Sequence, residues 1–394
     1  MPSVFELEQK YFLPTYKRLS LDIVRGSGCY LYDRDGKEYL DFFGGLAVNA
    51  LGYGHPKIID AITRQVHQYI HLSNFFVQEP QIRLAERLIA ASGYHKLFLG
   101  NSGTEAIEGA IKLARKWGGK KGKTQLFGLS NSFHGRTMGA LSLTERAKYR
   151  EGYEPFLPNT GHIRFNDVSD LRSKVDDKTL GVVLEVIQGE GGVNVVSQEF
   201  CGELTALRKK HGFLIIADEI QCGIGRTGKF FGFQHTGLHP DIVVVAKALG
   251  GGLPLGAFMS TEEIAKAFTF GVHGTTFGGN PVACAAGVVV LEEVAEGGLM
   301  QRAGKIGDRL MTAFRGLQKD LPGVITDVRG FGCMVGVQLS KEGQPVVDEL
   351  QRRGILVNCT NVNVLRFLPP YVVTDEQCEK VARELGLVLE GLKE

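Results

Sequence analysis

Between Lys96 and Phe258 the chain alternates short apolar runs with helical or glycine-rich segments, and no other feature of the sequence constrains the fold as strongly. The runs KLFLG, TQLFGLS, TLGVVLEVI and FLIIADEI are rich in aliphatic or aromatic residues, as buried strands are. Strands that alternate with helices predict an α/β fold with a mainly parallel sheet flanked by helices. Ligands of such sheets lie beyond the carboxyl ends of the strands, where the glycine clusters of this chain also fall.

One of these strand ends carries Lys247, within DIVVVAKALGGGLPLGAF. A β-branched run stops there at a glycine-rich turn, so we expect a buried strand that delivers a primary amine to a loop. Burial lowers the pKa of an ammonium group, and lysines placed in this way often act as Schiff-base nucleophiles. The stretch alone is more typical of a lysine that extends to the surface at a strand end, because buried lysines are rare.

The chain divides into three parts by pattern. Residues 1–56 contain a helix, an extended arm and a hairpin signal, and we assign them to a small domain. Residues 57–290 form the predicted large domain, and residues 291–394 form the C-terminal part of the small α/β domain. Helical spacing outside the alternating region occurs in Lys57–Ile70, Gln81–Ala91, Leu299–Leu321 and Thr374–Leu392, the last with Thr374 as its N-cap.

Composition disfavours several classes of protein. A formal net charge of +2 without a basic run argues against nucleic acid and membrane surfaces as partners. The N-terminal segment has mixed charge, and no stretch of ~18 apolar residues occurs, so we expect neither a secretory signal nor a membrane span. The 7 cysteines are scattered and lack a CxxC pattern, which favours a reducing cytoplasm over a disulfide scaffold and predicts no metal site.

Two segments offer groups that suit a phosphate. In NSGTEA a polar turn opens a helix, so Ser102, Thr104 and the unpaired N–H groups of the first turn suit an anion. In HGTTFGGNP, Thr275, Thr276 and the glycines form a loop with many donors. An ordinary capping box explains the first segment equally well, and a tight turn explains the second.

Two other segments offer groups that suit an aromatic ring and a carboxylate. In NSFHGRT, Phe133 suits stacking on a planar ring and Arg136 suits a bidentate contact with a carboxylate, unless they are a core phenylalanine and a surface arginine. Asp218 ends the buried strand of FLIIADEI and needs a cationic partner, either a protonated pyridine nitrogen or an arginine of the chain. With Lys247, these groups are the parts that a pyridoxal phosphate enzyme needs.

The motifs together resemble those of the class III (omega) aminotransferases, pyridoxal phosphate enzymes of fold type I, and most closely those of the acetylornithine group. The resemblance covers about Thr15 to Leu392 and rests on YLDFFGGLAVNALGYGHP, NSGTEA, FHGRTMGALSLT, QGEGGV, DEIQCGIGRTGKFF, AKALGGGLPLGA, HGTTFGGNP and RFLPP. It implies an aspartate aminotransferase-like fold, pyridoxal 5′-phosphate as cofactor, and a homodimer with a shared active site. It also implies two half-reactions that move the terminal amine of N2-acetylornithine to 2-oxoglutarate in arginine biosynthesis.

The resemblance implies a role for each residue that contacts the cofactor. Lys247 would be the Schiff-base lysine and the base that moves a proton between the substrate carbon and the cofactor. Asp218 would keep the pyridine nitrogen protonated, Gln221 would bond near the phenolic oxygen, and Phe133 would stack on the ring. The phosphate would be bound by Ser102, Gly103 and Thr104, joined by the partner subunit's Thr276.

The resemblance also implies four substrate-binding residues. Arg136 would hold the carboxylate far from the reacting amine, and Thr275 would lie close to the substrate. Arg366 would bind the α-carboxylate of glutamate. Because a terminal-amine substrate has no carboxylate at that place, Glu190 would cover the arginine and avoid an unpaired buried charge. A plain structural ion pair is the alternative for the last two.

Three positions depart from the family pattern, and several related activities stay open. Ile107 stands where many relatives have Asn, Val186 where Pro is usual, and Phe76 where Tyr is common. Ornithine, succinylornithine, 4-aminobutyrate and carrier-bound aminoadipate semialdehyde aminotransferases are the neighbouring possibilities. Glutamate-semialdehyde aminomutase is disfavoured by Arg366 and Glu190. A DNA-binding regulator is disfavoured by the near-neutral charge.

Overall fold

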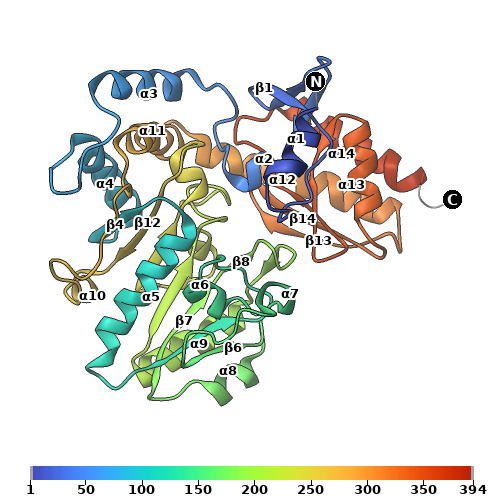
Figure 1. Ribbon diagram of the computed structural model, residues 1–394. Helices are drawn as coiled ribbons and strands as arrows, with labels where there is room; N and C mark the ends of the chain where they lie inside the picture. The colour runs from blue at the N-terminus through green and yellow to red at the C-terminus, as the bar shows by residue number, and fades with distance from the viewer. Residues whose placement is uncertain (1–2, 392–394) are drawn as a thin grey trace.

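A seven-stranded sheet forms the centre of the larger of two lobes in the computed structural model, which describes residues 3–391 (Figure 1). The strand order is β4-β12-β11-β10-β7-β5-β6. Strand β12 is antiparallel to both of its neighbours, and the other pairs are parallel, so the predicted mainly parallel α/β sheet is confirmed. The strands are β4 (Lys96–Gly100), β5 (Gln125–Leu129), β6 (Thr160–Ile163), β7 (Thr179–Leu184), β10 (Leu214–Asp218), β11 (Ile242–Val245) and β12 (Gly256–Ser260).

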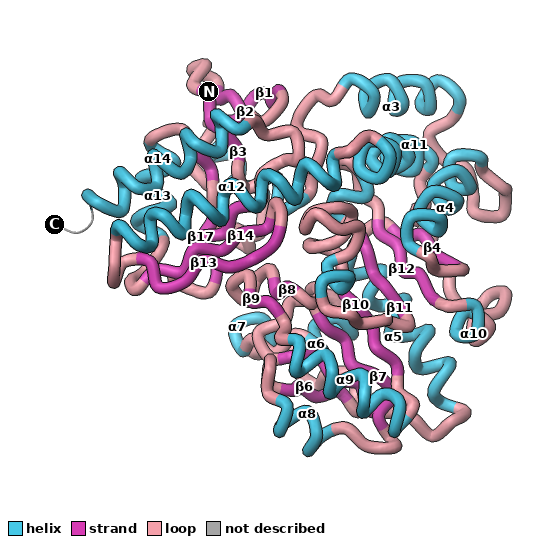
Figure 2. Tube along the Cα trace, turned by 180° about the vertical axis from the view of Figure 1, so that it is seen from behind, coloured by secondary structure: helices cyan, strands magenta, loops and turns pink. Residues whose placement is uncertain are grey.

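Helices cover both faces of this sheet, which explains why its central strands are apolar on both sides. Alternate residues of a strand point to opposite faces. Ile216 and Val244 therefore pack in one apolar cluster with helix α5, whereas Ile215 and Val243 pack in a second cluster that includes helix α9. Figure 2 shows α9 on one side of the sheet and α5 on the other. The covering helices include α5 (Gly103–Gly119), α8 (Val168–Lys174), α9 (Gln198–His211) and α11 (Pro281–Leu291).

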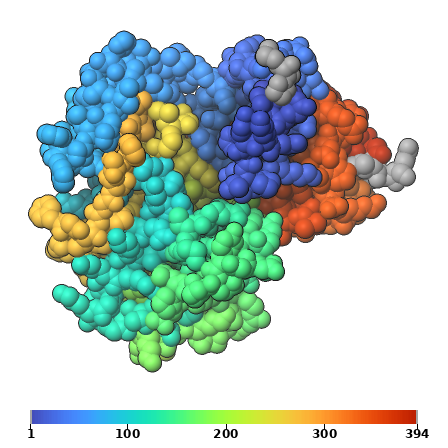
Figure 3. Space-filling view, in the orientation of Figure 1, coloured from blue at the N-terminus to red at the C-terminus, as the bar shows by residue number. Residues whose placement is uncertain are grey.

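The smaller lobe is built from both ends of the chain. A four-stranded antiparallel sheet, β13-β14-β17-β16, has the long helices α12 and α14 and the shorter helix α13 on one side (Figure 2). A second sheet pairs β15 of the C-terminal part with β3 of the N-terminal part. Figure 3 shows the dark blue N-terminal part against the orange C-terminal part. This pairing supports our proposal that residues 1–56 and 291–394 form one domain. The elements are β1 (Ile23–Ser27), β2 (Tyr30–Asp33), β3 (Glu38–Asp41), α12 (Leu299–Asp320), β13 (Ile325–Phe331), β14 (Met334–Leu339), α13 (Gln344–Arg352), β15 (Ile355–Leu356), β16 (Asn358–Thr360), β17 (Val364–Phe367) and α14 (Asp375–Gly391).

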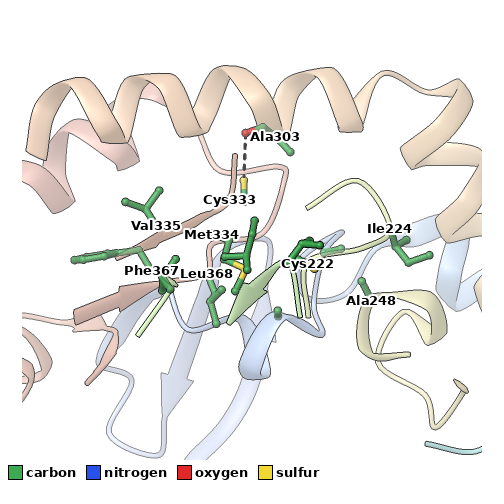
Figure 4. Close-up of a cluster of buried hydrophobic side chains, with 14 of the residues drawn as sticks. Cys222, Ile224, Ala248, Ala303, Cys333, Met334, Val335, Phe367 and Leu368 are labelled. Atoms are coloured by element: carbon green, nitrogen blue, oxygen red, sulfur yellow. Dashed lines mark hydrogen bonds between the residues drawn. The ribbon is translucent and has the colours of Figure 1, made fainter. Parts of the chain in front are cut away.

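A continuous apolar cluster joins the two lobes. Cys222 of the larger lobe lies near Met334 and Leu368 of the smaller lobe, below α12 (Figure 4), and Ile224 belongs to the same cluster. All four side chains are buried. Because this shared core resists separation, the loop after β10 is held at a fixed place relative to the smaller lobe.

Three predicted helices lie within two residues of the observed ones: α3 (Pro56–Gln68), α4 (Glu79–Ser92) and α12. The last predicted helix corresponds to α14, and Thr374 accepts the predicted capping bond from Gln377, while Leu392 lies outside the described residues. The remaining short elements are α1 (Val4–Tyr11), α2 (Gly44–Ala47), α6 (Met138–Leu143), α7 (Ala147–Arg150), β8 (Ile187–Gln188), β9 (Asn194–Val195) and α10 (Glu262–Ala265). No helix within residues 3–391 combines the length and apolar character that crossing a membrane requires.

Candidate active site

A cavity of about 450 Å³ opens beyond the carboxyl ends of β10 and β11, at the place where ligands of parallel sheets bind. Its volume is within the range of small-molecule sites. Residues from separate parts of the sequence meet in its wall. The predicted site residues that line it are Ser102, Gly103, Thr104, Phe133, Arg136, Glu190, Asp218, Gln221 and Lys247.

Lys247 follows strand β11 after one intervening residue and has a left-handed backbone conformation, with φ +47°. A side chain other than glycine is strained there, and such strain is typical of functional sites. The side chain of Lys247 is partly buried in the cavity wall. Burial lowers its pKa, and the nearby Arg366 lowers it further, although Glu190 and Asp218 oppose the shift. The lowered pKa favours the neutral amine, which is the nucleophilic form.

Asp218 is the last residue of β10, and its carboxylate is buried at the floor of the cavity. One of its oxygens lies 2.7 Å from Nδ1 of His134, and the other accepts a hydrogen bond of 3.0 Å from the Ile220 N–H. Burial lowers the pKa of His134, but the hydrogen bond and the charge of Asp218 outweigh it, and the pKa is raised overall. His134 is therefore the hydrogen-bond partner on one side of the Asp218 carboxylate, and Asp218 favours its protonated form.

Sequence reasoning gave His134 no role, although it lies between Phe133 and Arg136 in NSFHGRT. The signal was available, since Asp218 was expected to need a cation. What the sequence did not reveal is that the loop after β5 crosses the end of β10. Among the described residues, Nε2 of this buried histidine has no hydrogen-bond partner.

Helix α5 begins at the cavity. The Ser102 hydroxyl accepts a bond of 3.3 Å from the Glu105 N–H, so it is the N-cap of the helix. The Thr104 hydroxyl lies 2.9 Å from that of Thr137. A Cβ on Gly103 would lie 2.7 Å from Cδ1 of Ile220, so only glycine fits without displacing that side chain. The start of α5 thus presents hydroxyls and helix N–H groups to the cavity, where they favour an anion.

Arg366 lies on β17 and is completely buried behind the cavity wall. It donates a bond of 2.7 Å to Glu190 and one of 3.0 Å to Gln221, both of which line the cavity. Burial raises the pKa of Glu190, but Arg366, Lys247 and Arg146 together lower it by more, which favours the ionised carboxylate. Nη2 of Arg366 has no hydrogen-bond partner within residues 3–391, which leaves it able to accept a further anion.

Arg136 is exposed at the mouth of the cavity. Its guanidinium carbon lies 3.9 Å from the ring centroid of Tyr149 and 5.4 Å from that of Phe133. Stacking on an aromatic face holds an arginine in place while its edge stays free for a carboxylate. Tyr149 had not been singled out in the sequence, because nothing in its local pattern separates it from a surface tyrosine.

Thr275 and Thr276 do not line the cavity of Lys247. They lie in a second hollow of about 720 Å³, beside Asn74 and Phe75. The Thr275 hydroxyl accepts a hydrogen bond of 3.2 Å from the Gly278 N–H. The fold of one chain therefore brings most of the predicted site residues together but leaves these two apart.

Two buried carboxylates near the cavity were also missed. Glu185 lines the cavity after β7, and burial raises its pKa to about 7. Glu219 lies next to Asp218 outside the cavity wall, and burial raises its pKa to about 7 as well. Each accepts two backbone hydrogen bonds. Gly189 lies only four residues after Glu185, but Phe133 is distant from Glu185 in sequence, and no local pattern reveals that contact.

Known proteins resemble this chain over nearly its whole length. A family model described as Aminotransferase class-III matches residues 11–389. The acetylornithine aminotransferase of Aquifex aeolicus is 43% identical over 382 residues, which cover 96% of this chain and 100% of the relative. That of Methanocaldococcus jannaschii is 42% identical over 393 residues, covering 98% of each chain. A crystal structure of ornithine aminotransferase from Toxoplasma gondii has a TM-score of 0.94 and 31% identity, covering 99% of this chain and 94% of that one.

Proposed function

Because the chain belongs to the class III aminotransferases, enzymes that use pyridoxal 5′-phosphate, we propose that it transfers the terminal amine of N2-acetylornithine to 2-oxoglutarate. The products are N-acetylglutamate 5-semialdehyde and glutamate, and the reaction is a step in arginine biosynthesis. The acetylornithine aminotransferases at 43% and 42% identity support this substrate. Within the chain, the ion pair between Glu190 and Arg366 beside Lys247 carries the proposal.

The residues of the cavity fit the cofactor. Asp218 is a buried carboxylate that suits a protonated ring nitrogen, and Phe133 offers an aromatic face. The hydroxyls and N–H groups at the start of α5 suit the phosphate. When bound, pyridoxal phosphate supplies an electron sink for the substrate carbon that bears the amine.

Lys247 then has two tasks. Its amine would hold the cofactor, and once released from it the same amine would move a proton at the substrate carbon. Both tasks need the neutral amine, which the lowered pKa favours. Gln221 positions the neighbouring part of the ring, since its side chain lines the cavity and is itself fixed by Arg366.

Glu190 and Arg366 would let one site accept two kinds of amine. While the terminal amine of the donor reacts, Glu190 neutralises Arg366, so no buried cation is left unpaired. When glutamate enters, its α-carboxylate replaces Glu190 on the arginine. Arg136 holds the carboxylate at the opposite end of either substrate. Thr275 lies outside its own chain's cavity, so the partner subunit's Thr275 would be the one close to the substrate.

We also propose a cytoplasmic homodimer whose partner subunit's Thr276 completes the phosphate site. The position of Thr276 outside its own chain's cavity supports this arrangement. The cysteines of the described chain are all free, which supports a reducing compartment.

A direct comparison of donors tests the substrate. N2-acetylornithine, ornithine, N2-succinylornithine and 4-aminobutyrate are each supplied with 2-oxoglutarate, and glutamate formation is measured. The proposal predicts the highest kcat/KM for N2-acetylornithine. A higher value for another donor would transfer the assignment to that amine. Failure of all four, together with conversion of glutamate semialdehyde without 2-oxoglutarate, would replace the aminotransferase by an aminomutase.

A further inference from the structure

We propose that Glu185 is a positioning residue whose single carboxylate ties the loop that carries Phe133 to the loop that carries Glu190. The inference rests on the proposed function, since it concerns the ring-stacking and carboxylate-exchanging residues of that site. It assigns a role to a buried acid that the reaction itself does not use.

The geometry joins two loops that are far apart in sequence. Glu185 follows strand β7 and is only 5% exposed. One of its oxygens accepts a hydrogen bond of 2.8 Å from the backbone N–H of Phe133, and the other accepts one of 2.9 Å from the backbone N–H of Gly189. Gly189 immediately precedes Glu190. The same side chain therefore fixes the backbone of the stacking residue and the backbone next to the exchanging carboxylate.

Further contacts restrain the loop of Gly189 besides its hydrogen bond to Glu185. A Cβ on Gly189 would overlap the side-chain amide of Gln221, so the backbone passes close to a second cavity residue. The carbonyl of Glu190 accepts hydrogen bonds from Thr360 and Arg146 on the opposite side. Glu185 is thus the link to the backbone N–H of Phe133 itself. The Gln188 side chain adds bonds of 2.7 Å to the Ser130 carbonyl and 3.3 Å to the Ser132 hydroxyl, and Thr360 links the loop to the smaller lobe.

Only a carboxylate fills this role with its side chain at this position. Both of its oxygens accept, whereas a carboxamide has one acceptor and turns N–H donors toward the second backbone N–H. A buried carboxylate also costs free energy to desolvate, and these two hydrogen bonds offset part of that cost. Burial raises the pKa of Glu185 to about 7, but the two backbone donors lower the pKa and so favour the ionised form. Hydrogen bonds to that charged acceptor are stronger than neutral ones, which suits a link that must hold two loops at once.

Two variants separate this role from general stability. Glu185→Gln retains the shape but loses one of the two bonds, and Glu185→Leu loses both. The first readout is the rate of the glutamate half-reaction divided by that of the N2-acetylornithine half-reaction. The second is the dissociation constant of the cofactor. We expect Glu185→Gln to raise either the ratio of the two half-reaction rates or the dissociation constant of the cofactor by about tenfold. Glu185→Leu should raise both the ratio and the dissociation constant.

Glu219→Gln is the matched control. Glu219 is also buried and accepts bonds of 2.7 Å and 2.9 Å from the backbone N–H groups of Gly232 and Phe233. Its neighbours Asp218 and Ile220 line the cavity, but Glu219 and its two donors do not, so it ties no second loop of the cavity wall. We expect Glu219→Gln to have a lower melting temperature than the wild type. The ratio of half-reaction rates and the dissociation constant of the cofactor should be unchanged. If Glu185→Gln is well folded and behaves like Glu219→Gln, the inference is overturned. If the wild-type enzyme does not convert N2-acetylornithine, the proposed function fails instead, and the cofactor dissociation constant still tests the link to Phe133.

Discussion

Glu190 and Asp218 show how a site residue depends on a partner that is distant in sequence. Asp218 was expected to need a cation, and the structure supplies His134 at 2.7 Å. Glu190 was expected to cover Arg366, and the two lie 2.7 Å apart within a buried region. In each case one charge makes the other tolerable in a poorly solvated place, so removing one partner has a specific consequence.

Removing the Glu190 carboxylate should change which amine the enzyme prefers. In Glu190→Ala, Arg366 stays free, so binding of the glutamate α-carboxylate no longer competes with an internal ion pair. We expect the kcat/KM for glutamate relative to that for N2-acetylornithine to rise by about tenfold or more. Glu203→Ala, which removes a surface ion pair with Arg172, is the control. An unchanged ratio would show that the pair is only structural.

Stability should report the charge on His134. A histidine whose pKa is raised in the folded state stabilises the folded protein. Its contribution to the free energy of unfolding is complete when the pH is below the ordinary histidine pKa of 6.5, and it is lost as the pH rises through the folded-state pKa. His134→Gln keeps a donor for Asp218 but cannot be charged. The difference in denaturation midpoint between wild type and variant should therefore be largest below pH 6.5 and should narrow above it. A constant difference between about pH 6 and about pH 9 would contradict a charged His134.

At the scale of helices and strands, the sequence predicted those elements whose formation depends on local residue patterns. The apolar runs and the αL glycine that ends α9, Gly212, appear where periodicity and turn chemistry place them. Helix α11 was missed because it is apolar all round and has no amphipathic face to detect. Strand β12 was missed because GAFMS is short and follows a proline turn, and its antiparallel place between β4 and β11 depends on long-range packing. The same limit applies to the site. Residues within recognisable motifs were predicted as site residues, whereas Glu185, His134 and Tyr149 were not, because their roles depend on contacts that are distant in sequence.

Two glycine substitutions should have opposite effects. A Cβ on Gly256 of β12 would overlap the backbone of Ser102, so Gly256→Ala should displace the start of α5. We expect it to lower the free energy of unfolding by about 1–3 kcal/mol and to weaken cofactor binding. Gly202 lies exposed within α9 with no atom near its Cβ position, so Gly202→Ala should stabilise by about 0.5–1 kcal/mol. Denaturant titration measures the free energy of unfolding of each variant, and cofactor titration measures its affinity for the cofactor. Equal effects of Gly256→Ala and Gly202→Ala would contradict the contact between position 256 and the Ser102 backbone.

For the whole molecule, the surface around Thr276 is the part that one chain leaves open. Phe75 is 98% exposed and Val77 is 88% exposed in the same region. Exposed apolar groups that cluster in this way mark an interaction surface. A shared site would explain why Thr276 lies here and not beside its own Lys247.

Subunit complementation tests that arrangement. Lys247→Ala chains and Thr276→Ala chains are co-expressed with different tags, and the mixed dimer is purified. If the partner subunit's Thr276 completes each site, the mixed dimer contains one site with both residues intact and one site with neither. We expect one fully active site per mixed dimer at a cofactor concentration where Thr276→Ala alone is inactive. No recovery would place both residues in the site of the same chain.

The attachment point of the cofactor tests the central assignment most directly. The cofactor-loaded enzyme is treated with sodium borohydride, digested and analysed by mass spectrometry. The strained backbone and lowered pKa of Lys247, together with its place beside Asp218, predict that the peptide containing Lys247 carries the mass of the reduced cofactor. Modification of a different lysine, or cofactor that washes away from every peptide, would contradict the assignment.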